Sequence, residues 1–102
     1  MPKKPMDILT ESMFYVLMAL EQAPKCGTEI ADFITSRTRG RLQMGPATLY
    51  TILSKFAEER YIREIQVCGR KRTYQITERG CSAYATELNR LKQCITDAQG
   101  GM

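Results

Sequence analysis

The fold is decided by two stretches of the sequence: residues 45–56, GPATLYTILSKF, and residues 69–72, GRKR. Pro46 has the fixed backbone angle that suits the first turn of a helix. Apolar side chains then recur at spacings of three and four residues, which predicts that one stripe of the helix lies in a core. The residues of this stripe are Leu49, Ile52, Leu53 and Phe56.

The other positions of this helix carry small or hydrogen-bonding side chains: Ala47, Thr48, Tyr50, Thr51, Ser54 and Lys55. Such a face suits a helix that enters the major groove of DNA, which is about 12 Å wide, and that meets base edges and phosphates there. An ordinary amphipathic helix with a polar face toward solvent is the alternative explanation.

Residues 61–67 and 73–76 are rich in β-branched and aromatic side chains, and residues 68–72 separate them. This pattern predicts a β-hairpin with a cationic turn. Three adjacent cations repel one another and add nothing to a core, so their grouping favours a polyanionic partner over a merely solvated turn. Together with the preceding helix, the hairpin predicts a mainly α-helical protein with a small β-hairpin wing, a winged helix-turn-helix.

The chain has 102 residues, of which 43% are hydrophobic and 25% charged, as expected for one folded domain. Its net charge is +4, and cations gather at Arg37, Arg39, Arg41 and residues 70–72. This charge favours nucleic acid as the partner, with an anionic membrane surface as the alternative. There is no apolar run of about 20 residues and no leader resembling a signal peptide, so we expect a cytoplasmic protein.

Metal and cofactor sites are not expected. The four cysteines, Cys26, Cys68, Cys81 and Cys94, show no Cys-x-x-Cys spacing, and the chain has no histidine. Cys81 and Cys94 would lie about 20 Å apart along one helix, too far for a disulfide. We therefore expect reduced thiols, with a redox role for Cys68 as an open alternative.

Two further helices complete the predicted head of the molecule. Thr10 is a suitable N-cap for a helix that runs to Glu21 or Gln22, where Ala23-Pro24 stops it. A second helix begins near Gly27 and ends in a turn at Gly40. Only the ends, residues 1–7 and 100–102, are expected to be disordered.

The last helix begins after Thr77, which can cap it, and carries a heptad-like stripe. Cys81, Leu88 and Ile95 occupy one repeated position, Tyr84, Leu91 and Ala98 occupy the other, and Glu87, Arg90, Lys92 and Asp97 are expected outside. Packing on the first helix would cover this stripe, but a head with its own core favours a homodimer. We expect a DNA-binding domain over residues 1–77, then a dimerisation helix and tail over residues 78–102, with the interface formed by Cys81, Tyr84, Leu88, Leu91 and Ile95.

Over nearly its whole length the sequence resembles the PadR-like family of winged-helix transcriptional regulators, in particular small members with a single C-terminal helix. The matching motifs, in order, are Gly27-Thr28-Glu29-Ile30, Gly45-Pro46-Ala47-Thr48-Leu49-Tyr50, Glu58-Glu59-Arg60-Tyr61-Ile62 and Arg72-Thr73-Tyr74-Gln75-Ile76-Thr77-Glu78-Arg79-Gly80.

The resemblance implies a dimeric DNA-binding protein, usually a repressor. The two-fold symmetry of such a dimer implies a pseudo-palindromic operator. Thr48 and Tyr50 would contact bases or phosphates, and Arg70, Lys71 and Arg72 would lie on the wing; helix geometry adds Ala47, Thr51 and Lys55. Two positions depart from the family pattern. Thr28 stands where tyrosine is common, and Arg60 stands where a glycine often closes the third helix, which suggests a different helix end.

Some members of the family bind planar aromatic effectors near the dimer interface. In this chain Phe14, Tyr84 and Leu88 are candidates for such a pocket, unless they are simply packed core. Two other classes of function remain as alternatives, namely a winged helix that binds protein rather than DNA, and an enzyme. An enzyme is not expected, because the chain has no histidine, no Gly-rich phosphate loop and no paired carboxylates in an evident apolar cleft.

Overall fold

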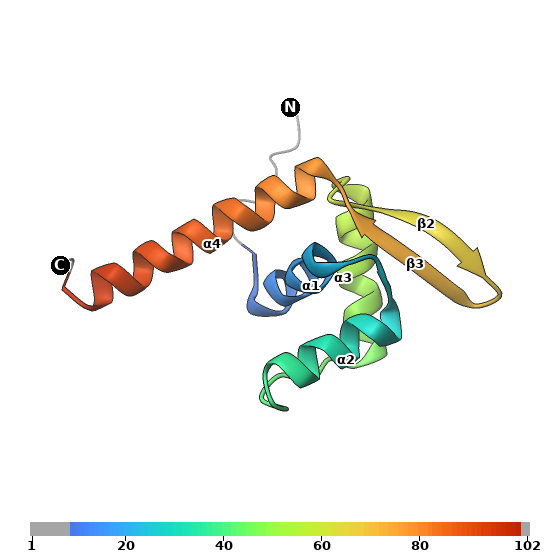
Figure 1. Ribbon diagram of the computed structural model, residues 1–102, viewed down its shortest axis with the longest axis horizontal. Coiled ribbons are helices and arrows are strands. Elements are labelled where there is room, and N and C mark those ends of the chain that lie inside the picture. The colour runs from blue at the N-terminus through green and yellow to red at the C-terminus, as the bar shows by residue number, and fades with distance from the viewer. Residues whose placement is uncertain (1–8, 101–102) are drawn as a thin grey trace.

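The computed structural model describes residues 9–100 as four helices and a small sheet (Figure 1). The ends that the sequence predicts to be disordered lie outside this range, except for Gly100. The elements in chain order are α1 (Glu11–Gln22), β1 (Lys25–Cys26), α2 (Gly27–Arg37), α3 (Pro46–Glu58), β2 (Ile62–Cys68), β3 (Lys71–Ile76) and α4 (Glu78–Ala98).

The helix starts follow the local chemistry of the sequence. The Thr10 hydroxyl accepts a hydrogen bond from the backbone N–H of Met13 at 3.2 Å, and Thr77 accepts one from Gly80 at 3.1 Å. Pro46 occupies the first turn of α3, where its missing N–H costs nothing. These three predicted helix starts are confirmed.

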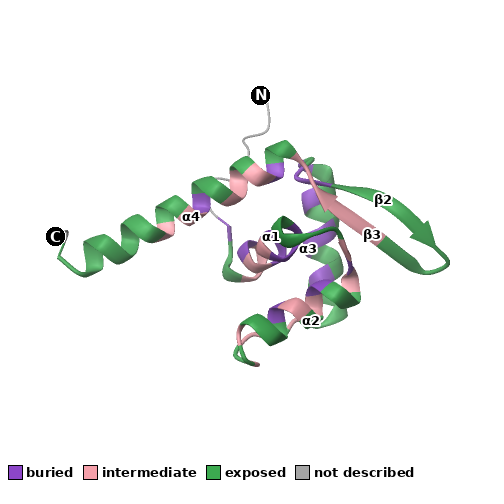
Figure 2. Cartoon of the chain, viewed as in Figure 1, coloured by how far each residue is buried: buried purple, intermediate pink, exposed green. Residues whose placement is uncertain are grey.

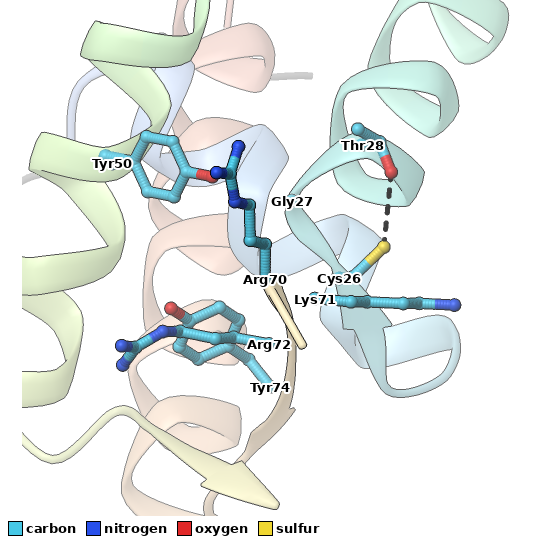
Figure 3. Close-up of a pocket in the computed structure, with 8 residues that line it drawn as sticks. All are labelled: Cys26, Gly27, Thr28, Tyr50, Arg70, Lys71, Arg72 and Tyr74. Atoms are coloured by element: carbon cyan, nitrogen blue, oxygen red, sulfur yellow. Dashed lines mark hydrogen bonds between the residues drawn. The ribbon is translucent and has the colours of Figure 1, made fainter. Parts of the chain in front are cut away.

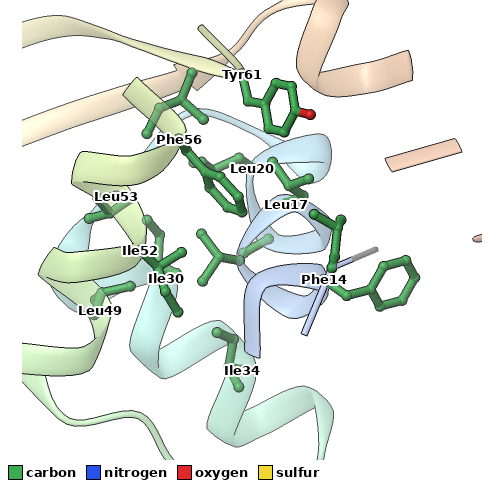
Figure 4. Close-up of a cluster of buried hydrophobic side chains, with 14 residues drawn as sticks. Phe14, Leu17, Leu20, Ile30, Ile34, Leu49, Ile52, Leu53, Phe56 and Tyr61 are labelled. Atoms are coloured by element: carbon green, nitrogen blue, oxygen red, sulfur yellow. The ribbon is translucent and has the colours of Figure 1, made fainter. Parts of the chain in front are cut away.

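Helices α1, α2 and α3 enclose one hydrophobic core (Figure 4). The predicted stripe of α3 is buried, and Phe56 is fully so. It meets fully buried side chains of the two preceding helices, which are Val16, Leu17, Ile30 and Ile34. The core therefore fixes which face of α3 remains outside.

The wing is tighter than expected, and it belongs to a three-stranded antiparallel sheet of order β1-β3-β2. The predicted five-residue turn is wrong, because β2 and β3 pair as far as Cys68 and Lys71 and leave only Gly69 and Arg70 between them. Gly69 has φ +63°, a backbone angle that glycine adopts without strain. On the other side of β3, Lys25 pairs with Tyr74, which ties the start of α2 to the wing.

The end of α3 is also different from the expectation. Arg60 lies in the left-handed region, with φ 64°, where a glycine would be unstrained. The N–H of Arg60 donates to Ala57 O at 3.1 Å and that of Tyr61 to Phe56 O at 2.8 Å. These two bonds form a Schellman motif. The helix thus ends in the way a glycine would end it, and the arginine bears the backbone strain.

Helix α4 leaves the core on the side opposite the wing (Figure 1). Its first half packs on α1, where the rings of Phe14 and Tyr84 stack with centroids 5.1 Å apart. Beyond Leu91 every described residue of α4 is exposed, and Figure 2 shows this half in green. The helix is therefore covered by its own chain over only part of its length.

The prediction that Glu87 faces outward is wrong. Its residue surface is only 3% exposed, because this position of α4 faces the start of α1. The carboxylate accepts hydrogen bonds from the backbone N–H of Leu9 at 3.3 Å and from Arg90 at 2.7 and 2.8 Å. The bonds from Arg90 hold the pKa of Glu87 below its ordinary value.

Candidate nucleic-acid interface

The outer face of α3 is polar and open. All five of its predicted contact residues are exposed: Ala47, Thr48, Tyr50, Thr51 and Lys55. Tyr50 is the most conspicuous, with 57% of its surface accessible. The Thr51 hydroxyl already donates to the Ala47 carbonyl at 3.0 Å, so toward a ligand it can act as an acceptor and present its methyl group.

The three cations of the wing are all exposed, but they differ in their partners. Arg70 lies in the turn, and neither it nor Lys71 makes an ion pair with the part of the chain that the structure describes. Arg72 lies on β3 and pairs across the hairpin with Glu64 at 3.1 Å. The charge available to a ligand is therefore concentrated at Arg70 and Lys71.

A cavity of about 340 Å³ joins the wing to the outer face of α3 (Figure 3). Its lining residues come from β1 and the start of α2, from α3, and from the wing; they are Cys26, Gly27, Thr28, Tyr50, Arg70, Lys71, Arg72 and Tyr74. The structure thus brings Tyr50 together with all three predicted wing cations. Ala47, Thr48, Thr51 and Lys55 share the helix with Tyr50 but lie outside this cavity.

Sequence reasoning missed the contribution of Cys26, Gly27, Thr28 and Tyr74 to this cavity. They arrive there because β1 pairs with β3, with Cys26 opposite Thr73. A two-residue strand has no periodicity to detect, so the sequence offered only the position of Gly27 and Thr28 at a helix start and the presence of Gly27, Thr28 and Tyr74 in the matching motifs.

Two ionisable groups next to the cavity have shifted pKa values. The pKa of Glu29 is lowered, because its carboxylate accepts the backbone N–H of Cys26 at 2.8 Å. The pKa of Tyr74 is raised by burial and by the nearby charge of Glu64, so its hydroxyl stays protonated and can donate. Glu29 is thereby held beside the cavity, outside its lining.

The other predicted cations are exposed and make surface contacts on the helical head. Arg41 pairs with Glu11 at 2.9 Å and donates to the Tyr15 hydroxyl at 3.2 Å. The Arg37 guanidinium lies 4.7 Å from the centre of the Phe33 ring. These residues, with Arg39, lie around the C-terminal end of α2, whereas the wing adjoins its N-terminal end (Figure 1). The cations that the sequence analysis singled out therefore form two groups.

The predicted interface residues of α4 differ in exposure. Cys81, Tyr84, Leu88 and Leu91 are half-buried, whereas Ile95 is 57% exposed. Burial is the main cause that raises the pKa of the Cys81 thiol, which makes it less reactive.

The three residues predicted for an effector pocket do not enclose one by themselves. Phe14 is buried and its ring stacks on the ring of Tyr84, so no room for a ligand remains between the two rings. A cavity of about 340 Å³ lies beside the stack, and its lining includes Phe14, Tyr15, Arg90 and Leu91 but neither Tyr84 nor Leu88. A small molecule near these residues would therefore sit beside the stacked rings.

Within residues 9–100, no group of three or more histidine, cysteine, aspartate or glutamate side chains is placed to hold a metal ion. The same residues include no helix that is both long enough and apolar enough to span a bilayer.

Comparisons with known proteins agree with this architecture. The family described as "Transcriptional regulator PadR-like family" matches residues 16–86. No curated protein sequence matches the chain.

Several solved structures share the fold. A transcriptional regulator from Clostridium thermocellum superimposes with a TM-score of 0.77 at 21% identity, over 85% of this chain and 88% of that one. A PadR family regulator from Clostridium difficile gives 0.68 at 17% identity, over 84% and 94%. Bacillus subtilis PadR in complex with operator DNA gives 0.68 at 18% identity, over 78% of this chain and 47% of that one. The family match covers most of the chain, and this protein belongs to the PadR-like family of transcriptional regulators.

Proposed function

We propose that the protein is a sequence-specific DNA-binding repressor that acts as a homodimer. One observation carries the proposal: the exposed face of α3 and the cations of the wing adjoin the same cavity, through Tyr50 on one side and Arg70, Lys71 and Arg72 on the other. A duplex that received α3 in its major groove would bring its backbone to the wing. The DNA complex of Bacillus subtilis PadR, which shares this fold, supports the proposal.

The contact residues would divide into two kinds. Ala47, Thr48 and Thr51 are small enough to approach base edges, and thus to contribute sequence preference. Tyr50, Lys55 and the three wing cations would contact phosphates, which position the protein on the duplex. Thr48→Ala should accordingly change the preference among sequences and leave the salt dependence of binding nearly unaltered.

The shape of α4 supports the homodimer. Its 21 residues make a helix about 31 Å long, and its second half projects without cover from the described chain. Short helices that pack against nothing are marginal in water, so a partner helix would stabilise this half. Leu88, Leu91 and Ile95 would meet their counterparts across a two-fold axis, which would place two half-sites about 34–36 Å apart on DNA.

An aromatic effector that releases the DNA would bind where α1 meets α4, near the predicted residues Phe14, Tyr84 and Leu88. The cavity beside the Phe14–Tyr84 stack offers Tyr15 and Leu91 for packing, while the Arg90 guanidinium in its lining is already paired with Glu87. Calorimetry with a panel of planar aromatic molecules tests this part, and no heat at millimolar ligand would remove the effector from the proposal.

The DNA-binding proposal is tested by fluorescence anisotropy of labelled duplexes from the protein's own promoter region, titrated at several salt concentrations beside a scrambled duplex. We expect tight, salt-sensitive binding that prefers the promoter sequence and needs both half-sites. Equal binding to the scrambled duplex would refute sequence specificity. No binding to either duplex at low salt would leave a protein-binding winged helix as the function.

A regulator that binds the chromosome acts in the cytoplasm, where we place this one.

Repression is tested separately by transcription from that promoter in vitro. We expect added protein to lower transcript yield in proportion to operator occupancy. An increase in transcript would make the protein an activator.

A further inference from the structure

The cavity between α2, α3 and the wing has the chemistry of a small-molecule anion site. Three of its eight lining residues are cations, and the lining includes no acidic side chain. Two carboxylates are close by: Glu29, which accepts a hydrogen bond from Cys26 and interacts electrostatically with Lys71, and Glu64, which is paired with Arg72, so three cations face two acidic neighbours. An entering anion would therefore meet a net positive surface.

The same cavity also offers aromatic surface and neutral donors. Tyr50 and Tyr74 both line it, and Figure 3 shows their rings beside the side chains of Arg70 and Arg72. Flat rings of this kind stack on nucleobases and other planar molecules, and arginine adds to such stacking. The Thr28 hydroxyl, at the start of α2, lies on the opposite wall.

The walls of the cavity are held in place by bonds of the chain itself. The pairing of Lys25 with Tyr74 and of Cys26 with Thr73 fixes the start of α2 against β3. Cys26 and Glu29 form a reciprocal cap at that helix start, and the Cys26 sulfur lies 3.2 Å from the Thr28 hydroxyl oxygen. The site therefore exists before any ligand arrives, which reduces the entropy cost of binding.

The size of the cavity favours a free small molecule over the DNA backbone as its occupant. About 340 Å³ lies within the range of small-ligand pockets, roughly 300–1,000 Å³. A duplex offers its outer surface to such a pocket as phosphate and sugar, because its bases remain stacked inside. A single backbone phosphate would leave most of the volume unfilled and the tyrosine rings without a planar partner.

We propose that this cavity binds a free phosphate monoester that carries an aromatic ring and is about the size of a mononucleotide. The phosphate would lie among Arg70, Lys71 and the Thr28 hydroxyl, and the ring would stack against Tyr50. Such a ligand and a duplex would need the same cations, so the ligand would displace DNA by direct competition. The competition rests on the proposed DNA-binding function, whereas binding of the ligand does not.

The test is isothermal calorimetry of the full chain without DNA, with adenosine monophosphate and phenyl phosphate as probes. We expect saturable binding with a Kd of about 1 mM or below for at least one of them. Adenosine lacks the phosphate and inorganic phosphate lacks the aromatic ring, so each should bind about tenfold more weakly or not at all. Equal binding of inorganic phosphate would reduce the site to a simple anion site and overturn the proposal, as would no heat with either probe.

Three variants locate the site. Lys71→Ala should weaken binding of the probe by about tenfold or more, because it removes a cation from the lining. Arg63→Ala removes the same charge from a different cavity, which it lines with Arg60 and Arg79, and should leave the Kd unchanged. Equal losses in the two variants would mean that only net charge attracts the probe.

Thr28→Tyr fills the cavity without removing a cation, and its position is exposed, so the chain should fold normally. We expect this variant to lose the probe in calorimetry of the chain without DNA. A variant that still binds the probe would place the ligand elsewhere. If no form of the protein binds duplexes but the wild type binds the probe, the DNA function fails and the ligand site stands.

Discussion

Among the described glycines, Gly80 is the one at which an added methyl group should lower the free energy of unfolding the most. A Cβ there would run into the backbone carbonyl of Tyr61 and lie 2.7 Å from the Ile76 side chain. That carbonyl cannot turn aside freely, because it accepts the N–H of Thr77 at 2.9 Å, and Tyr61 itself is buried. Relief would require α4 to move away from the hairpin and the core.

The expected magnitude is the difference of two opposing effects. Overfilling a packed site costs about 1–3 kcal/mol, or more where backbone must shift. Alanine is favoured over glycine inside a helix by up to about 1 kcal/mol. Because the obstacle is backbone, we expect Gly80→Ala to lower the free energy of unfolding by about 1–3 kcal/mol, at about 4–8 °C of Tm per kcal/mol.

Thermal and urea unfolding followed by circular dichroism would measure this loss, at one protein concentration for all variants because oligomers unfold in a concentration-dependent way. Gly27→Ala is the matched control. It adds the same methyl group at a helix start, but 3.7 Å from the Leu49 side chain, an ordinary contact. We expect it to be neutral or slightly stabilising. If Gly80→Ala unfolded at the same Tm as wild type, the reasoning about the close approach of α4 would be wrong.

Three further predictions concern the wing, the buried carboxylate and the strained helix end. The double variant Arg70→Ala, Lys71→Ala should weaken binding to every duplex and reduce the slope of log K against log salt by about 2; an unchanged slope in anisotropy titrations would show that the wing contacts no phosphates. Glu87→Gln should lose about 1–3 kcal/mol near pH 7, because an ionised, hydrogen-bonded partner of Leu9 and Arg90 is removed. Because the folded pKa of Glu87 is lowered, its carboxylate contributes stability above the unfolded pKa of about 4.3, and this contribution is lost as the pH falls through the folded pKa. The difference in unfolding free energy between wild type and Glu87→Gln should therefore shrink in urea melts as the pH is lowered below the unfolded pKa, and a constant difference would contradict this reasoning. Arg60→Gly should raise stability by up to about 1 kcal/mol, since it relieves the left-handed strain, and a lower urea midpoint would show that the arginine side chain outweighs the strain.

The parts of the fold that the sequence predicts are those set by local chemistry. Thr10, Pro46 and Thr77 start helices through their own side chains or ring, and the spacing of the apolar residues of α3 is enough to orient that helix. The cationic residues of the hairpin are similarly visible, because no core position would hold them. The winged helix-turn-helix architecture follows from these features, and the structure confirms it.

The parts that escape the sequence depend on contacts between distant segments. Glu87 looks like a surface residue until Leu9 and Arg90 are placed around its carboxylate. The pairing of Arg72 with Glu64 depends on a hairpin register that shifts at a bulge between Glu64 and Gln66. Such contacts decide which charges are used within the chain, and spacing alone does not reveal them.

The same holds for the candidate site. The exposed face of α3 was predictable residue by residue, whereas the cavity beside it was not. Thr28 and Tyr74 are 46 positions apart in sequence and meet through the two-residue strand β1. The concave part of the interface is therefore a product of sheet topology.

Strand β2 beyond Ile62 contributes almost nothing to the core, since all six of its remaining residues are exposed. Substitutions near the tip consequently alter charge and shape at little cost in folding free energy. The helical head, by contrast, is closely packed and resists change. If the wing contacts phosphates as proposed, such a regulator could strengthen or weaken its hold on DNA at the tip while the scaffold that presents the α3 face stays unaltered.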